Sequence, residues 1–359
     1  MSKNIKILSP GRICLFGDHQ DYLGLPVIAC AIDRYINLEA TENSTNLFNI
    51  LLPDISETRS IKVDTLFEKV DHRDYFASSL KVLRRYHCIP NKGYDVVIKG
   101  NLPINAGVSS SSALIIAWVR FLIEAFGVSE KVTPVLVSKI AYEAEVVEHG
   151  EPGGLMDQYS IGIGDILFIN TGVDTSYMRI GDKIEGLIVG ESGVKKDTVG
   201  TLGDRKEKAL EAIAHVKAKL NGFDIAKVNI DEYENYEMHI PEELKPYFFA
   251  AVENHSITKR ALLEFKKEKP EMVFLGTLMN QHHHVLKNIL KITVPTIDKM
   301  IDAAMQSGAF GAKIVGSGGG GSIVAIAPKE KQHLVVDAII EAGGKAAYVV
   351  NVDQGVRVI

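Results

Sequence analysis

Cysteine is scarce in this chain of 359 residues: Cys14, Cys30 and Cys88 lie far apart and show no Cys-x-x-Cys spacing. This pattern argues against a disulfide framework and against a thiolate metal site, so we expect reduced thiols. The chain also lacks a large excess of either charge, because its net charge is -5 and acidic and basic residues are mixed along it. Without a basic stripe to neutralise many phosphates, nucleic acid is not expected as a partner.

Long apolar runs are absent as well. The longest, Leu114 to Phe126, is interrupted by Arg120 and Glu124 and is shorter than the roughly 20 residues that a membrane-spanning helix requires. The first ten residues lack the apolar run and the small-residue cleavage site of a secretory signal. We therefore expect a cytoplasmic protein without membrane contact, and no protein partner can be inferred.

The order of apolar patterns predicts an α+β protein with about two domains. Strands and helices are expected to be segregated rather than to alternate regularly as βαβ units, and the part after Gly200 consists mainly of long charged helices. Strands are expected within Ile5 to Glu42, at Tyr94 to Lys99 and at Asp165 to Asn170. Helices are expected at Asp74–Tyr86, Ser111–Phe126, Pro134–His149, Arg205–Leu220, Pro246–Lys267, Phe274–Leu290 and Thr296–Gln306. The change in composition predicts a domain boundary near residues 172 to 200.

A serine-rich turn, Pro103 to Ala113, precedes an apolar helix and contains no lysine. The first amides of a helix have no acceptors within it, and the helix dipole favours an anion there. Serine hydroxyls can cap some of these amides and leave others aimed outward, which predicts a phosphate cradle. A Walker loop is excluded because no Gly-Lys-Ser/Thr tripeptide occurs. The alternative for this segment is a well-capped structural helix.

Two further segments carry clustered acids. After Gly11, the chain presents Arg12 on a strand and then Asp18, His19 and Asp21 on one tight turn, a grouping that suits the hydroxyls of a small polyol. The alternative is a polar hairpin loop whose Asp and His side chains cap backbone groups.

In the second segment, a helix carrying Glu145 ends at Gly150, and Gly153-Gly154 precede Asp157. This arrangement can direct two carboxylates into one cleft. The alternatives are a solvated helix face for Glu145 and a helix N-cap for Asp157.

The glycine cluster Gly311 to Ser322 contains a literal G-x-G-x-x-G. A dinucleotide fingerprint requires a helix after these glycines, whereas Ile323 to Ala327 has the pattern of a strand, so we expect a hairpin that closes over phosphates or forms an inert turn. His282-His283-His284 are not expected to bind a metal, because consecutive helical residues point about 100° apart.

Together these segments resemble the GHMP small-molecule kinases and, within that family, the galactokinase branch. The resemblance covers nearly the whole chain, with three motifs in the family's order: Ser9 to Tyr22, Pro103 to Ala113 and Gly311 to Ser322. Gly154 to Gln158 is similar to the galactokinase segment that holds the catalytic aspartate. Mevalonate-type members carry lysine where Arg12 stands and lack the His-x-Asp-Tyr sequence, which favours the sugar branch.

The resemblance implies a two-domain GHMP kinase-like fold. Residues 1–180 would form an N-terminal domain like domain 2 of ribosomal protein S5, and residues 181–359 a C-terminal ferredoxin-like α/β sandwich. The implied activity is ATP- and Mg²⁺-dependent phosphorylation of a sugar, with D-galactose as the expected substrate and galactose 1-phosphate as the product.

The same resemblance implies roles for single residues. Asp157 contacts the attacking sugar hydroxyl, Arg12 neutralises charge on Asp157 and on the transferred phosphate, and Ser111 with Glu145 holds Mg²⁺. The implied sugar-binding residues are Asp18, His19, Asp21, Gly154 and Asp157. The implied ATP-binding residues are Gly107, Val108, Ser109, Ser110, Ser111, Ser112, Gly318 and Gly319.

The chain departs from the galactokinase pattern at three positions. The usual Glu-His-Thr-Asp-Tyr is replaced by Asp18-His19-Gln20-Asp21-Tyr22, and Leu202 stands where a tyrosine is expected before Arg205. A lost hydrogen-bonding partner can change substrate preference strongly. Kinases for a heptose, a uronic acid or a pentose therefore remain alternatives, followed by a mevalonate-type kinase and a non-catalytic sugar sensor.

Overall fold

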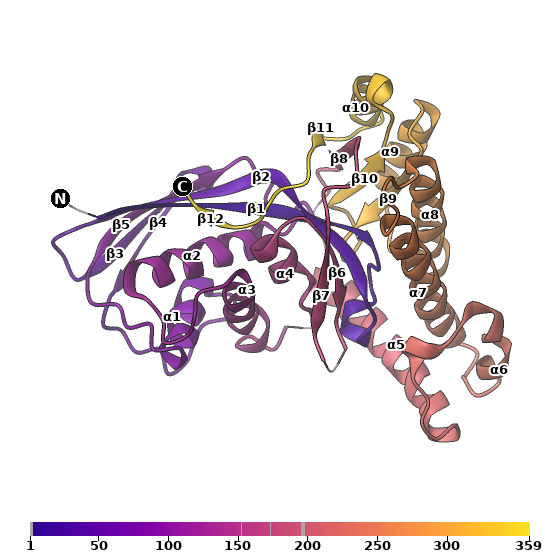
Figure 1. Ribbon diagram of the computed structural model, residues 1–359, viewed down its shortest axis with the longest axis horizontal. Helices are drawn as coiled ribbons and strands as arrows, with labels where there is room; N and C mark the ends of the chain where they lie inside the picture. The colour runs from indigo at the N-terminus through magenta and orange to yellow at the C-terminus, as the bar shows by residue number, and fades with distance from the viewer. Residues whose placement is uncertain (1–2, 152, 173, 195–197) are drawn as a thin grey trace.

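The computed structural model describes residues 3–151, 153–172, 174–194 and 198–359. Figure 1 shows two lobes, the first built on a large sheet with helices against one face and the second built on a smaller sheet flanked by long helices. The expected α+β class is confirmed by these two separate sheets and their segregated helices.

The large sheet has eight strands, seven of which come from the first half of the chain. Its main path runs β12-β1-β2-β5-β3-β4, and β6 continues from β2 to β7. All neighbours are antiparallel except β3 and β5. The strands are β1 (Asn4–Phe16), β2 (Val27–Glu42), β3 (Leu47–Leu52), β4 (Glu57–Lys62), β5 (Tyr94–Gly100), β6 (Ile166–Asn170), β7 (Ser176–Gly181) and β12 (Arg357–Val358).

Four helices lie on one side of this sheet, with α2 (Ser110–Phe126) and α4 (Met156–Ile163) against its strands and α1 (Tyr75–Arg85) and α3 (Pro134–Tyr142) packed on those helices. Two of them begin at side-chain caps, because Asp74 accepts a hydrogen bond from the amide of Ala77 and Thr133 accepts one from the amide of Leu136. Helix α2 is apolar over most of its surface, and its fully buried Trp118 packs against the rings of Phe48, Phe76 and Phe121. This core holds the start of α2 in a fixed place.

The second lobe contains a four-stranded antiparallel sheet in the order β11-β8-β10-β9. Its strands are β8 (Leu187–Glu191), β9 (Gly311–Val315), β10 (Ser322–Ile326) and β11 (Ala346–Val350). Its helices are α5 (Thr198–Lys219), α6 (Glu234–Glu237), α7 (Lys245–Phe265), α8 (Met272–His284), α9 (Pro295–Gln306) and α10 (Gln332–Glu341).

Several short helical turns lie between these elements. Two are π-helical and extend α3 and α8, and the others are single 3-10 turns. They are η1 (Asp21–Leu23), η2 (Pro53–Ile55), η3 (Glu143–Val147), η4 (Ile225–Lys227), η5 (Ile230–Glu232), η6 (Val285–Ile289) and η7 (Lys329–Lys331).

Most expected elements are confirmed to within a few residues, including α1, α2, α7, α9 and the strands β5 and β6, whereas α5 begins at Thr198, seven residues before the expected Arg205. The expected hairpin across the glycine cluster is also confirmed, because β9 and β10 pair in antiparallel register. Two expectations need correction: the helices expected over 134–149 and 274–290 are α-helical only to Tyr142 and His284, and each then widens into a π-helical turn, η3 and η6 respectively. The short strands of the second sheet before residue 200 and after residue 340 were not anticipated.

The chain passes from the first sheet to the second between Gly181, the end of β7, and Leu187, the start of β8. The domain boundary at residues 180/181 stays a prediction, and the last strand does not follow it, since β12 pairs with β1 in the first lobe. The three cysteines are buried and free. In the part of the chain that the structure describes, no helix has both the length and the apolar composition needed to cross a membrane.

Candidate active site

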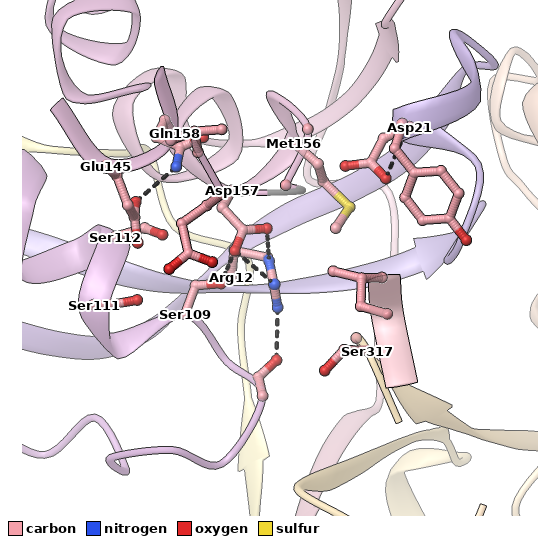
Figure 2. Close-up of a pocket in the computed structure, with 18 of the residues that line it drawn as sticks. Arg12, Asp21, Ser109, Ser111, Ser112, Glu145, Met156, Asp157, Gln158 and Ser317 are labelled. Carbon is pink, nitrogen blue, oxygen red and sulfur yellow. Dashed lines mark hydrogen bonds and ion pairs between the residues drawn. The ribbon is translucent and has the colours of Figure 1, made fainter. Parts of the chain in front are cut away.

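A cavity of about 550 Å³ lies where the two lobes meet. It is bounded by β1, the loop after β1 (residues 17–24, the acidic loop), the loop before α2 (residues 103–109, the serine loop), η3, α4 and the turn between β9 and β10 (residues 316–321, the glycine turn). Figure 2 shows Arg12 and Asp157 facing each other in its middle, with Glu145 on one side and Asp21 on the other.

Arg12 reaches the cavity because Gly11 lets the serine loop lie directly on β1. A Cβ atom at Gly11 would stand 2.3 Å from a side-chain carbon of Leu102 and 3.0 Å from the carbonyl oxygen of Val108. That close approach allows the Arg12 amide to donate to the Val108 carbonyl at 3.1 Å. The Arg12 guanidinium then donates to the Gly107 carbonyl at 2.6 Å. Strand and loop therefore fix the arginine from both ends.

Arg12 and Asp157 form a bidentate ion pair. The Nε atom of Arg12 donates to Oδ1 of Asp157 at 2.7 Å and Nη2 donates to Oδ2 at 2.9 Å. Burial opposes the charged guanidinium, but the Asp157 carboxylate outweighs it and raises the pKa of Arg12 above its usual value. Asp157 is the second residue of α4, so the alternative of a helix N-cap is wrong: the N-cap is Leu155.

The start of α2 presents backbone amides to the cavity. Gly107 and Ser109 both have left-handed backbone conformations, with φ of 86° and 58°, and the helix begins at Ser110. The Ser109 hydroxyl does not cap the helix but donates to Asp157. The amides of the first turn have no acceptors within the helix, which leaves an anion-binding helix end beside Arg12.

Glu145 lies on the side of the ion pair where α2 begins, which we call the serine side. Its side chain is buried, so the alternative of a solvated helix face is wrong. Gln158 donates to its Oε2 atom at 2.6 Å, and the hydroxyls of Ser111 and Ser112 also hydrogen-bond to it. Burial and the nearby Asp157 carboxylate raise the pKa of Glu145 to about 7. A cation placed here would restore the charged form.

Asp21, His19 and Gly154 gather on the opposite side of the ion pair. Gly154 allows this, because a Cβ atom there would stand 2.2 Å from Oδ2 of Asp21. Burial and the charge of Asp157 raise the pKa of Asp21 to about 6. The two ring nitrogens of His19 contact the Tyr22 hydroxyl at 3.0 Å and the Ser317 carbonyl at 3.2 Å. This side of the cavity therefore presents the Asp21 carboxylate to a polyhydroxylated ligand, with an imidazole and a phenol that are hydrogen-bonded to each other beside it.

Asp18 borders the cavity, but both of its carboxylate oxygens are bonded to the second lobe, to Lys313 and to the amide of Gly316. Gln20 is fully buried and donates to the Pro26 carbonyl at 2.7 Å, outside the cavity. The alternation along the acidic loop thus directs His19 and Asp21 to the cavity and Gln20 away from it.

Three residues predicted to bind ATP do not line this cavity. Val108 is fully buried and uses its carbonyl for Arg12. Gly318 packs against Ile292, since a Cβ atom there would be 2.5 Å from the Ile292 Cβ, and the Gly319 amide donates to the Ile292 carbonyl at 2.8 Å. The glycine turn contributes Gly316 and Ser317 to the cavity in their place.

Sequence reasoning missed other residues of the cavity. Gln158 follows Asp157 directly in the sequence, but no local pattern indicates its contact with Glu145. Lys313 could have been identified from the sequence, because a lysine in the middle of an apolar strand requires a buried partner of opposite charge. Arg73, Tyr75 and Glu151 line the cavity edge, and none stood out in the sequence.

The three consecutive histidines point to different surroundings, as the helical spacing predicts. His282 stacks on the ring of Phe16, and burial lowers its pKa to about 3. His284 is exposed and its Nδ1 atom contacts the Asn288 side chain at 2.9 Å.

Comparison with known protein families agrees with this geometry. The model of the GHMP kinases N terminal domain matches residues 74–165, and that of the GHMP kinases C terminal domain matches residues 269–345. The model of the galactokinase galactose-binding signature matches residues 3–41, the segment that contains Arg12 and the acidic loop. The chain belongs to the GHMP kinases. It is therefore an ATP-dependent small-molecule kinase, and the expected family membership is confirmed.

Relatives within the GHMP kinases include more than one activity. A galactokinase from Thermococcus kodakarensis is 26% identical over 99% of this chain and 100% of its own length. A mevalonate kinase from Thermococcus sibiricus is 28% identical over 98% of this chain and 97% of its own length. Among solved structures, Lactococcus lactis galactokinase in complex with galactose superimposes with a TM-score of 0.86 at 22% identity, covering 99% of this chain and 95% of that one. This last likeness bears on the fold alone.

The buried acids predict how the stability of the metal-free protein depends on pH. The pKa of Glu145, about 7, lies above its ordinary value of 4.5, so its protonated form stabilises the fold at low pH and this stability is lost as pH rises through 7. Asp21 acts in the same direction at lower pH, with a pKa of about 6. We expect Glu145→Gln to flatten the decline between pH 5 and 7 by about 2 kcal/mol.

The measurement is urea unfolding at several pH values with a chelator present. Glu130→Gln, a change at an exposed glutamate outside the cavity, is the matched control and should keep the wild-type slope. Identical slopes for wild type and Glu145→Gln would contradict the assignment of this carboxyl.

Proposed function

We propose that this protein transfers the γ-phosphate of ATP to the anomeric hydroxyl of D-galactose and so forms galactose 1-phosphate. The observation that carries the proposal is the bidentate Arg12–Asp157 pair, which lies between the amides at the start of α2 and the acidic loop. A phosphoryl donor and a polyhydroxylated acceptor can therefore meet at one charged pair. The match of the galactose-binding signature to residues 3–41 supports the choice of sugar.

In this proposal the sugar lies on the side of Asp21, His19 and Gly154, and its reacting hydroxyl donates a hydrogen bond to Asp157. The carboxylate of Asp157 already accepts from two Arg12 nitrogens and from the Ser109 hydroxyl. These donors hold the carboxylate in place, so it orients the hydroxyl and accepts its proton as the new O–P bond forms. Arg12 stabilises negative charge on the transferred phosphoryl oxygens.

The phosphates of ATP lie on the serine side, against Gly107 and the first turn of α2. This part of the cavity suits a polyphosphate because the first turn of α2, whose amides lack acceptors within the helix, lines it and because Arg12 is already charged and fixed. Positioning and charge stabilisation are the main demands of phosphoryl transfer. The absence of a P-loop lysine is consistent with this arrangement, in which aligned amides and one arginine carry the charge.

Mg²⁺ would be held by the Glu145 carboxylate and the Ser111 hydroxyl. These residues fit the ion: both offer hard oxygen atoms, Ser111 is within hydrogen-bonding reach of Glu145, and the raised pKa of Glu145 marks a site that gains from a cation. No cluster of three or more acidic, histidine or cysteine ligands occurs among the described residues, which suits an ion that completes its shell with phosphates and water. When bound, Mg²⁺ neutralises phosphate charge.

The positions at which the chain departs from galactokinases weaken the case for galactose less than the sequence suggested. Gln20, which replaces a threonine, is buried outside the cavity and so removes no sugar contact. Leu202 lines the cavity, where a tyrosine was expected, and is the departure that bears on the sugar. Heptoses, uronic acids, pentoses and mevalonate therefore remain the comparison substrates, and a silent sensor would bind sugar and ATP without turnover.

A substrate panel tests the proposed function. Purified protein with ATP and Mg²⁺ should release ADP with galactose at a kcat/KM at least about tenfold above that for any other sugar or mevalonate. The measurement is a coupled ADP-release assay across hexoses, pentoses, heptoses, uronic acids and mevalonate. Faster turnover of mevalonate or of another sugar would replace galactose as the substrate, and binding without turnover would favour the sensor.

Replacement of the central carboxylate tests its role. We expect Asp157→Asn to lower kcat by about a hundredfold or more, because the amide cannot accept and orient the sugar hydroxyl in the same way and leaves Arg12 without its charged partner. The dissociation constant for ADP, measured by fluorescence titration, should change less than about threefold. Asp165→Asn, which removes a carboxylate outside the cavity, is the control. Near-normal turnover of Asp157→Asn would remove this residue from the reaction.

A magnesium titration tests the metal assignment. Glu145→Gln should raise the Mg²⁺ concentration that gives half-maximal rate by about tenfold, because a neutral amide oxygen is a weaker ligand than a carboxylate. Glu143→Gln, two residues away and bonded to Tyr86 outside the cavity, is the control and should keep the wild-type titration. An unchanged curve for Glu145→Gln would place the ion elsewhere.

A further inference from the structure

Lys313 is a fully buried lysine in the middle of β9. An ammonium group without water must be paired to remain in the fold. Its Nζ atom donates to Oδ2 of Asp18 at 2.5 Å and to the Ile314 carbonyl at 2.9 Å. This ion pair joins the second lobe to the acidic loop of the first, and the mechanism above does not use it.

Asp18 is committed to this contact with both oxygens. Its Oδ1 atom accepts from the amide of Gly316 at 2.8 Å, and the residue is only 2% exposed. Burial alone would raise its pKa, but the Lys313 ammonium outweighs that effect and lowers the pKa of Asp18 to about 2, so the carboxylate is charged at neutral pH. A ligand hydroxyl would have to compete with two strong donors for this group.

The neighbouring residue forms a second link between the same two segments. His19 contacts the Ser317 carbonyl at 3.2 Å and lies in the left-handed backbone region, with φ of 64°. A non-glycine residue keeps such a conformation only when its surroundings hold it there. The glycine turn therefore holds both Asp18 and His19, and Ser322, directly after this turn, donates to the Ala106 carbonyl of the serine loop.

We propose that Lys313 is a positioning residue for the sugar, which acts through Asp18, and that Asp18 anchors the acidic loop and does not bind the sugar. The pair holds the loop so that His19 and Asp21 face the cavity. The inference rests on the proposed function, since it names the residues that align the acceptor side of the same site. Without the pair, the acidic loop loses its fixed link to β9, while the serine loop keeps its own hydrogen bond to β1 at Arg12.

Three variants test the pair: Lys313→Met, Asp18→Asn and both together. The double variant removes both charges with little change in volume, so it remains informative if a single variant with an unpaired buried charge fails to fold. We expect the double variant to raise the KM for the sugar by about tenfold and to lower kcat severalfold, because a displaced loop misaligns the acceptor. The dissociation constant for ADP should change less than twofold.

Arg357→Met is the matched control. It removes a cation from the nearly buried Asp353, at 2.8 Å, in an ion pair outside the cavity. A general loss of stability would lower the active fraction of this variant but leave its KM for the sugar at the wild-type value. If Asp18→Asn raises that KM while Lys313→Met leaves it unchanged, Asp18 contacts the sugar itself and the proposal is wrong. Unchanged KM in the double variant would also overturn it.

Amide hydrogen exchange in the ligand-free protein separates this inference from the proposed function. The acidic loop contains protected amides, such as that of Leu23, which donates to the Gln20 carbonyl at 2.9 Å. Their exchange should accelerate at least about tenfold in the double variant and stay at the wild-type rate in Arg357→Met. A wild-type protein inactive on every sugar contradicts the proposed function. Unchanged exchange in the double variant contradicts the positioning role, whichever substrate the enzyme accepts.

Discussion

The charge of one buried arginine organises this site. Three of the carboxyl groups that line the cavity, those of Asp21, Glu145 and Asp157, lie around the ion pair, and of these three Asp157 is the one paired directly with Arg12. The charged forms of Asp21 and Glu145 are disfavoured here, because burial and the neighbouring Asp157 charge raise the pKa values of both groups. An enzyme that binds a polyphosphate, a cation and a polyol can use such a site, because a cation stabilises charged carboxylates and a polyol donates hydrogen bonds to them.

The geometry of the site depends on two glycines, at which the absence of a Cβ atom lets another segment come close. Gly11 lets the serine loop rest on β1, which brings Arg12 to the start of α2, and Gly154 lets Asp21 approach α4. At both positions a Cβ atom would collide with the group that must come close. The site is thus assembled by two close backbone approaches, each of which joins segments that are distant in the sequence.

Both lobes contribute residues to the site, and their contributions differ. The first lobe supplies Arg12, Glu145 and Asp157, and the second supplies the glycine turn that contacts both the acidic loop and the serine loop. The glycine turn therefore lies at the junction of the donor and acceptor sides. The buried Lys313–Asp18 pair makes this junction specific, because a misplaced turn would leave two charges without partners.

The sequence by itself determined the elements and most of the chemistry. Periodicity located the long helices, the lack of a lysine in the serine loop excluded a Walker site, and the strand after the glycine cluster excluded a dinucleotide fold, because these depend on local spacing. It also supplied Arg12, Glu145 and Asp157. Only the tertiary structure decided that Gln20 is turned away from the cavity, that Gly318 and Gly319 pack against Ile292, and that Asp18 is held by Lys313. Those contacts join residues as many as 295 positions apart, and no local pattern encodes which distant group a buried side chain will meet.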